Sequence, residues 1–121
     1  MGGKRRLAPP ENFRQWIASL TEGTVWDRIQ RLHVHHCEVP LEVRILKLNE
    51  EVGEVAEAFI GMRGLNSRKG VCRSREDLLD ELADVIITAA VAMSAAADNS
   101  ASEAAAHLER RLDVVTARTG V

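Results

Sequence analysis

The chain has 121 residues, of which 45% are hydrophobic and 28% charged, proportions that indicate one soluble globular domain. A formal net charge of -2 and an aromatic content of 3% argue against binding nucleic acid polymers through a basic field or base stacking. The longest run of low charge, 85–97, is too short to span a bilayer, and no apolar signal segment follows the basic start. The two cysteines lack a disulfide-framework spacing, so we expect a cytoplasmic protein with reduced thiols and no membrane contact.

The chain begins with two Gly residues and a Pro-Pro pair, which predict a flexible N-terminal arm over 1–10. Residues 11–121 are predicted to form a single all-α domain, a bundle of four to five helices, because no long β-type alternation occurs. A first helix is expected over 11–20, where the apolar residues recur at helical spacing. These residues are Phe13, Trp16, Ile17 and Leu20.

A second helix is expected from Val25 to about His36, because Thr24 and Asp27 resemble a capping box. One bent helix over 11–36 is the alternative. The central helix is predicted to begin at Val39-Pro40 and to run to about Met62, since Pro is favoured at a first helical position and Gly follows the end.

The central helix carries two acidic residues, Glu51 and Glu54, one turn apart at the margin of its apolar stripe. Like charges at this spacing repel each other, and a cation held between them would remove that cost. The stripe that we expect to face the core consists of Ile45, Leu48, Val52, Val55, Ala56 and Phe59.

After a predicted loop over 64–73, Ser74 and Asp77 predict the start of a helix that runs from about Arg75 to Ala97. Residues 98–100 predict a turn, and Ser100 with Glu103 predicts a capping box for a last helix over 101–118.

The helix after the loop repeats the acidic arrangement, with Glu81 and Asp84 one turn apart beside its own apolar stripe. Two antiparallel helices would bring both pairs together. Such an all-oxygen cluster suits a hard cation, Mg²⁺ or its substitute Mn²⁺. The predicted ligands are Glu51, Glu54, Glu81 and Asp84, and the alternative is that both pairs are solvated helix faces.

These motifs carry a family resemblance. Glu51-x-x-Glu54 followed by Glu81-x-x-Asp84 resembles the metal motif of MazG-type nucleoside triphosphate pyrophosphohydrolases. The flanking sequence is similar too, in the segments KLNEEVGEVAEAFIGMRG, GLNSRKG and EDLLDELADVIITA, so the resemblance covers residues of about 45–93. The resemblance implies an all-α fold of MazG type, bound magnesium, and cleavage of a nucleoside triphosphate to monophosphate and pyrophosphate.

Catalysis needs a base that activates the attacking water, and Glu50 and Glu51 are the candidates. Glu50 is equally compatible with a solvated surface position. Lys47, one turn earlier, is expected to pair with these carboxylates or to contact a phosphate. Glu57 and Asp80 are expected either to face solvent or to contact the metal ligands without binding the ion themselves.

The loop between the acidic helices contains Asn66, Arg68 and Lys69, which we expect to bind phosphate; a solvated loop is the alternative. Arg63 and Arg73 flank it and are weaker candidates. Trp16 or Trp26 would be needed to stack on a nucleobase, although core packing is the more common fate of each.

Near the end of the second helix lie His33, His35, His36 and Cys37. A structural zinc site requires four ligands and no second His/Cys pair is present, so an ordinary helix end is favoured. A di-iron bundle is disfavoured as well, because neither acidic motif contains Glu-x-x-His.

The run over 85–97 is apolar almost all round, which predicts burial on several sides. A small domain has little interior, so we expect the bundle to be completed by a second copy, as a homodimer or homotetramer. Enclosure in the monomer core is the alternative. A helical oligomerisation or regulatory module with a purely structural acidic seam is the alternative function.

Overall fold

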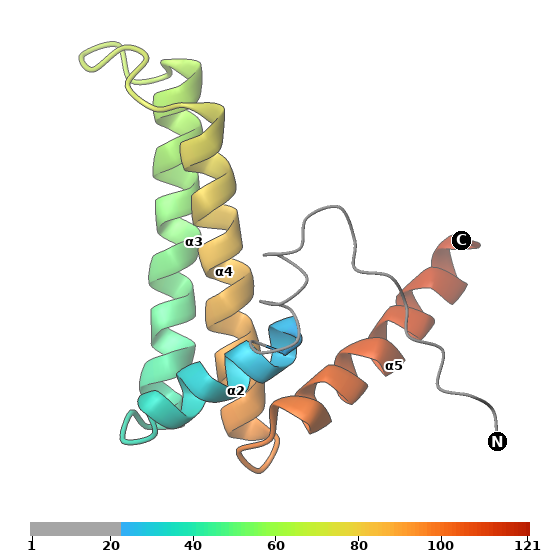
Figure 1. Cartoon of the computed structure of the whole chain (residues 1–121). Helices are drawn as coiled ribbons and strands as arrows, with labels where there is room; N and C mark the ends of the chain where they lie inside the picture. The colour runs from blue at the N-terminus through green and yellow to red at the C-terminus, as the bar shows by residue number, and fades with distance from the viewer. Residues whose placement is uncertain (1–22) are drawn as a thin grey trace, which may run out of the picture.

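The computed structural model describes residues 23–121, and this part of the chain is entirely helical (Figure 1). Four helices follow one another without a strand among the described residues, which confirms the prediction of an all-α chain for this region. They are α2 (Val25–His35), α3 (Leu41–Arg63), α4 (Arg75–Ala96) and α5 (Ala101–Thr119). The predicted arm over 1–10 and the predicted helix over 11–20 lie outside the described residues.

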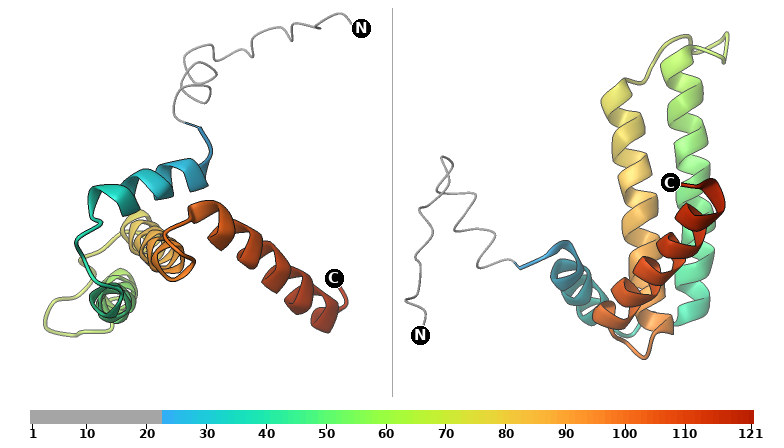
Figure 2. Two further views of the ribbon diagram at one scale, coloured as in Figure 1. Left: turned by 90° about the horizontal axis from the view of Figure 1, so that it is seen from below. Right: turned by 90° about the vertical axis from the view of Figure 1, so that its right-hand side faces the viewer.

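The long helices α3 and α4 form an antiparallel hairpin, which Figure 1 shows as two adjacent columns. The shorter α2 crosses the end of this hairpin where α3 begins and α4 finishes. From the same end α5 points away from the hairpin, and the left view of Figure 2 shows its C-terminal part standing apart. Helix α5 therefore packs against α2 and α4 mainly through its first turns.

Two of the predicted capping boxes are confirmed. At the start of α2 the Asp27 N–H donates to Thr24 Oγ1 at 3.2 Å, and the Thr24 N–H donates to Asp27 Oδ2 at 2.8 Å. The same reciprocal pair joins Ser74 and Asp77 at the start of α4. These bonds satisfy backbone donors that a helix N-terminus otherwise leaves free.

Two other helix starts differ from expectation. Pro40 is the extended N-cap of α3 rather than its first helical residue, so the helix begins at Leu41. At α5 only half of the predicted capping box forms, because Ser100 Oγ accepts from the Glu103 N–H while the reciprocal bond is missing. The Ser100 N–H, which would complete the box, donates instead to the Ser94 carbonyl at 3.1 Å and to the Ala97 carbonyl at 3.0 Å.

The turn between α4 and α5 is held in place by α2. Gln30 donates from Nε2 to the Asn99 carbonyl at 3.2 Å and accepts from the Ala101 N–H at 2.7 Å. His33 Nε2 lies 2.9 Å from Asn99 Oδ1, and Asp98 and Asn99 both adopt positive φ. Asn and Asp tolerate this left-handed backbone better than most residues, which explains their presence in the turn.

The buried core is small and consists mainly of alanine. Ile29, Ala90 and Ala101 pack together where α2, α4 and α5 meet, with Trp26 and Val91 against them. Small side chains let the three helix backbones approach closely at this crossing. The other buried hydrophobic residues of the described region are Ala58, Ala92 and Ala104.

The prediction that the apolar stripe of the central helix faces the core holds only in part for the single chain, since Leu48 and Val55 are half-buried while other members of the stripe are exposed. Ile45 and Val52 on that stripe are 53% and 52% exposed. The residues that α3 buries against α4 lie about 100° round the helix, because Val52 directly follows the buried Glu51. Helix α3 packs chiefly against α4, and one neighbouring helix covers only a narrow strip of its surface.

The run over 85–97 is likewise only partly covered. Ala90, Ala92 and Ser94 are buried, whereas Ile86 is 69% exposed. The alternative that the monomer core encloses the whole run is therefore wrong for the single chain. The helix also ends one residue earlier than expected, with Ala97 as its cap. Among the described helices, none combines the length and apolar character that crossing a membrane demands.

Candidate metal centre

The contact between α3 and α4, here called the seam, buries charged residues in its middle. On α3 the buried positions Arg44, Glu51 and Ala58 recur every seven residues and so lie on one side of the helix. Burying a charged side chain costs free energy unless it is paired or binds an ion. A helix pair formed for packing alone would carry apolar residues at the positions of Arg44 and Glu51, so these two buried charged residues need another explanation.

Three carboxylates meet at the seam. Glu51 from α3 and Glu81 and Asp84 from α4, the acidic triad, each place an oxygen within 4.8 Å of the others. Glu51 is buried, Glu81 half-buried and Asp84 exposed, so the triad is open to solvent on one side. In residues 23–121 this is the group of acidic, His or Cys side chains close enough to hold a metal ion.

Glu51 has one paired and one free oxygen. Its Oε1 lies 3.3 Å from Lys47 Nζ, whereas Oε2 is buried without a partner among the described residues. A buried carboxylate oxygen without a hydrogen bond is costly, and a cation among the triad oxygens would satisfy it. The donor set therefore fits a hard divalent ion such as Mg²⁺, with the open side available for water ligands.

The fourth predicted ligand, Glu54, lies beside the triad without being part of it. The negative charge of Glu51, followed by desolvation and by the charge of Glu81, raises the pKa of Glu54 above its ordinary value. The four carboxylates thus crowd together as the two motifs predict, but only three of them converge on one point.

Lys47 bridges Glu50 and Glu51, as its sequence spacing predicts. Its Nζ lies 3.4 Å from Glu50 Oε2, and hydrogen bonds to Glu51 first and Glu50 second raise the pKa of Lys47. The Glu50 side chain is 60% exposed, so it stands in solvent next to the triad. This position suits a base that takes a proton from water as much as it suits a surface ion pair.

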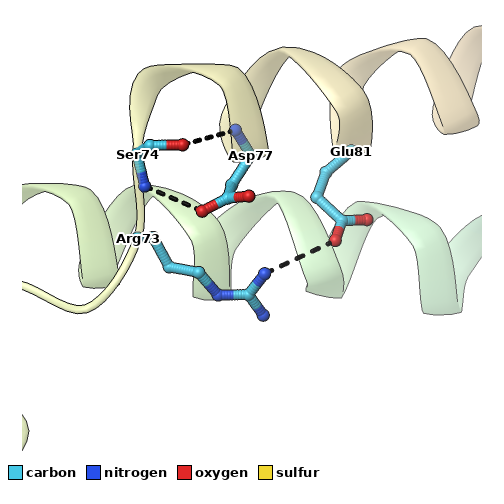
Figure 3. A network of polar contacts seen from close by, with 4 residues as sticks. All are labelled: Arg73, Ser74, Asp77 and Glu81. Carbon is cyan, nitrogen blue, oxygen red and sulfur yellow. Dashed lines mark hydrogen bonds and ion pairs between the residues drawn. The ribbon is translucent and has the colours of Figure 1, made fainter.

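A second cationic group comes from the start of α4. Arg73 Nη1 lies 3.9 Å from Glu81 Oε1, as Figure 3 shows, so this guanidinium reaches the edge of the triad. Figure 3 also shows the Ser74–Asp77 capping box directly beside it. The backbone and side-chain hydrogen bonds of Ser74 lower the pKa of Asp77, which keeps this cap ionised and the first turn of α4 fixed.

Arg73 is positioned by a glycine of α3. A Cβ added at Gly61 would lie 2.4 Å from Arg73 Cγ, and the Cys72 N–H donates to the Gly61 carbonyl at 3.0 Å. Only a residue without a side chain allows the loop to pass this close to α3. Gly61 therefore determines where the Arg73 side chain leaves the loop.

The predicted phosphate loop opens onto a cavity of about 290 Å³, the loop cavity, lined in part by Asn66, Lys69 and Arg73. Arg68 differs from these three, because its side chain does not line the cavity and its N–H donates to Asn66 Oδ1 at 3.1 Å. Arg73 thus ranks above Arg68 as a phosphate-binding candidate. Glu57 also lines the loop cavity, while Arg63 lies over the Phe59 ring at 5.8 Å.

Trp26, the predicted stacking residue, is half-buried and packs against the core of Ile29, Ala90 and Ala101. This position supports core packing rather than contact with a base. Trp16 lies outside the described residues.

The histidine cluster does not assemble a metal site. His33 is buried against Asn99, His35 and His36 pack edge to face with centroids 4.6 Å apart, and Cys37 is exposed and free. None of them belongs to the ligand group found in residues 23–121. The preference for an ordinary helix end over zinc is consistent with this arrangement.

Two site residues were absent from the sequence-based predictions, Arg44 and Gly61. The available signal for Arg44 was its position seven residues before Glu51, which places both on one helix face. No local signal distinguishes Gly61, because its role depends on a loop that returns to α3.

Comparisons of the chain with protein-family models, with curated proteins and with solved structures find no match.

Proposed function

We propose that the chain is a Mg²⁺-dependent nucleoside triphosphate pyrophosphohydrolase of MazG type, which releases monophosphate and pyrophosphate. The observation that carries this proposal is the buried Oε2 of Glu51, which has no hydrogen-bond partner among the described residues, on a carboxylate that lies close to those of Glu81 and Asp84. An acidic group at a helix surface is common without an ion. A buried carboxylate oxygen left without a donor is rare, because it loses hydration and gains nothing in return.

In this proposal Glu51, Glu81 and Asp84 hold the ion, and Glu54 lies close enough to serve as an additional or alternating ligand. A bound Mg²⁺ supplies neutralisation of the triphosphate and stabilisation of charge on the transferred phosphoryl group. Mg²⁺ retains several waters, which the exposed side of Asp84 accommodates.

The other residues orient substrate and water. Lys47 holds Glu50 and Glu51 in place, and Glu50 accepts the proton of the attacking water from its solvated position. Asn66, Lys69 and Arg73 bind the phosphates that leave as pyrophosphate, since they line one cavity and Arg73 also reaches Glu81.

Hydrolysis in ¹⁸O-labelled water with Mg²⁺ tests the reaction. Water that attacks the α-phosphorus places the label in the nucleoside monophosphate. Label in orthophosphate alone would refute the proposal, and so would the absence of Mg²⁺-dependent turnover across purine and pyrimidine triphosphates.

A non-enzymatic assembly module is the second candidate, favoured by the exposed apolar residues of α5. Leu108, Leu112 and Val115 recur at helical spacing and remain uncovered in the single chain. The two candidates make different predictions for the triad. In an assembly module Mg²⁺ adds no stability, whereas in the enzyme it does.

A further inference from the structure

A second cavity, here called the apolar cavity, lies on the opposite side of the triad from the loop. It measures about 380 Å³, within the range of roughly 300–1,000 Å³ typical of small-molecule sites. Its walls come from α2, the α2–α3 connection, α3 and α4. The apolar side chains among them are Leu32, Val39, Val43, Ile87 and Val91.

One charged residue in this cavity has no adequate partner. Arg44 is 7% exposed and lines the cavity, yet it forms no ion pair with a carboxylate among residues 23–121. Its Nη2 donates to the His36 carbonyl, while its Nε is buried and unbonded. A buried guanidinium is costly when one of its donors has no acceptor, so Arg44 is a charged residue of the cavity wall whose hydrogen-bonding capacity the described residues do not fill.

The apolar cavity is continuous with the candidate metal centre. Lys47 lines the cavity and also lies 3.3 Å from Glu51 Oε1 in the triad. On α4, Thr88 lines the cavity one helical turn after Asp84. Along the hairpin the acidic triad therefore lies between the apolar cavity and the loop cavity. A nucleoside triphosphate bound along this line would place its base in the apolar cavity, its reacting phosphate at the triad and its leaving phosphates in the loop cavity.

We propose that Arg44 selects nucleotides whose base carries an exocyclic carbonyl oxygen, such as 6-oxopurines and 4-oxopyrimidines, bound in the apolar cavity. Arginine has only N–H donors, so it matches a carbonyl oxygen and opposes an amino group at the same ring position. The apolar walls suit the faces of a base, whereas a phosphate there would lose its hydration. This inference rests on the proposed function, since it assigns the base to one side of the proposed reaction centre.

The test uses two pairs of substrates that differ mainly in oxygen against amino, inosine with adenosine triphosphate and uridine with cytidine triphosphate. With saturating Mg²⁺, kcat/KM of the wild-type protein is expected to favour the oxygen-bearing member by roughly ten- to hundredfold, the effect of a hydrogen bond to a charged group. Arg44→Met should bring both ratios close to one, and Arg44→Lys should retain part of the preference. The exposed Arg75 provides the control, since Arg75→Met should leave both ratios unchanged.

Equal turnover of both members by the wild-type protein, or unchanged ratios in Arg44→Met, would overturn the inference. If Arg44→Met does not fold by circular dichroism, Thr88→Met replaces it, because added volume at Thr88 fills the cavity and should raise KM at least about tenfold. A KM that stays unchanged counts against the cavity.

A binding measurement without hydrolysis distinguishes a failure of this inference from a failure of the proposed function. Inosine and adenosine monophosphates are titrated into the wild-type protein in EDTA, with affinity measured by calorimetry. Tighter binding of inosine monophosphate, abolished in Thr88→Met, supports the cavity even if no triphosphate is hydrolysed. Equal or absent binding of both monophosphates, in a protein that also lacks turnover, overturns it.

Discussion

Glu51 on α3 and Glu81 on α4 lie across the seam with carboxylate oxygens no more than 4.8 Å apart, although thirty positions separate them in the chain. Each has its own cation, Lys47 at 3.3 Å from Glu51 and Arg73 at 3.9 Å from Glu81. Lys47 precedes Glu51 by one turn on α3, and Arg73 comes from the loop that leads into α4, so the two cations lie on different sides of the triad along the hairpin. Each cation offsets part of the negative charge at the seam.

Glu51→Gln is expected to abolish the response to Mg²⁺, because the substitution keeps the shape of the side chain and removes the charge at the buried ligand. The loss of kcat/KM should exceed the roughly 10- to 100-fold cost of losing an outer-shell partner of a metal site. The matched control is Glu109→Gln on α5, where the residue is exposed. Steady-state kinetics over a Mg²⁺ titration measures the effect, and a variant as active as Glu109→Gln would remove Glu51 from the ligand set.

Glu54→Gln should separate stability from metal binding. Without metal, Glu51 and Glu81 repel the Glu54 charge and raise its pKa, so removing that charge relieves repulsion. In EDTA at pH 7.5 the variant should therefore melt at or above the wild-type Tm. With Mg²⁺ the order should reverse, since only the wild-type protein keeps all four carboxylates, and ligand at 100 times its Kd adds about 2.7 kcal/mol.

Scanning calorimetry with and without Mg²⁺ measures both halves of this prediction. A Glu54→Gln variant that is clearly less stable in EDTA, together with a wild-type protein that gains nothing from Mg²⁺, would indicate that the carboxylates are structural.

Gly61→Ala is expected to impair the loop cavity, because the new Cβ would lie 2.4 Å from Arg73 Cγ and displace the guanidinium from Glu81. KM for the triphosphate should rise, and the protein should lose stability. Gly53→Ala in the same helix provides the control, since nothing lies within 4 Å of its added Cβ. That control should gain about 0.5–1 kcal/mol from the better helix former, and equal behaviour of the two variants would contradict the role of Gly61.

The Ser74–Asp77 cap predicts that the stability of the folded protein depends on pH in the acidic range. Hydrogen bonds from Ser74 lower the pKa of Asp77 below its ordinary 3.8, so the folded state binds fewer protons than the unfolded state in this range. The stabilisation is therefore present above the ordinary pKa and is lost as the pH falls through the lowered folded pKa. Asp77→Asn should melt below the wild-type protein at pH 7, and the two Tm values should converge as the pH falls below 3.8.

Circular dichroism melts across this range measure the convergence. Parallel curves, with a constant difference in Tm down to the lowest pH, would exclude the charge of Asp77 as the origin of the effect. Ser74→Ala removes the other half of the box and should cost about 1 kcal/mol.

The exposed apolar surface predicts self-association. Ile45 and Val52 on α3, Ile86 on α4 and Leu112 on α5 are all exposed in the single chain, and burying each would be favourable. A homodimer or homotetramer is expected at micromolar concentration by light scattering. Leu112→Glu should weaken the assembly if the apolar face of α5 takes part, while a monomeric wild-type protein would contradict the prediction outright.

Much of the local structure was predictable because its causes are local. Thr24 with Asp27 and Ser74 with Asp77 form their capping boxes through bonds three residues apart, and Gly64 adopts the left-handed conformation that ends α3. The exception, at Ser100, also has a local cause, because the Ser100 N–H donates to the Ser94 and Ala97 carbonyls and is not free for Glu103.

The site was predictable only in part. The two acidic pairs identify the carboxylates, because a spacing of three residues places each pair on one side of a helix. The spacing does not reveal that Glu54 remains outside the triad, since this depends on how α3 and α4 are rotated against each other. It also does not separate Arg68 from Arg73, whose positions follow from the course of the loop.

The sequence by itself determined the four described helices, the capping boxes of α2 and α4 and the identity of the acidic residues, since each follows from contacts within a few positions of the chain. Only the tertiary structure decided which side of α3 is buried. Hydrophobic periodicity favoured a stripe that includes Ile45, Leu48, Val52 and Val55, of which Leu48 and Val55 are half-buried and Ile45 and Val52 exposed. The seam encloses Arg44 and Glu51 more completely than any residue of that stripe. Periodicity describes one helix, whereas burial depends on which neighbour covers it, and here that neighbour is α4, which carries Glu81 and Asp84.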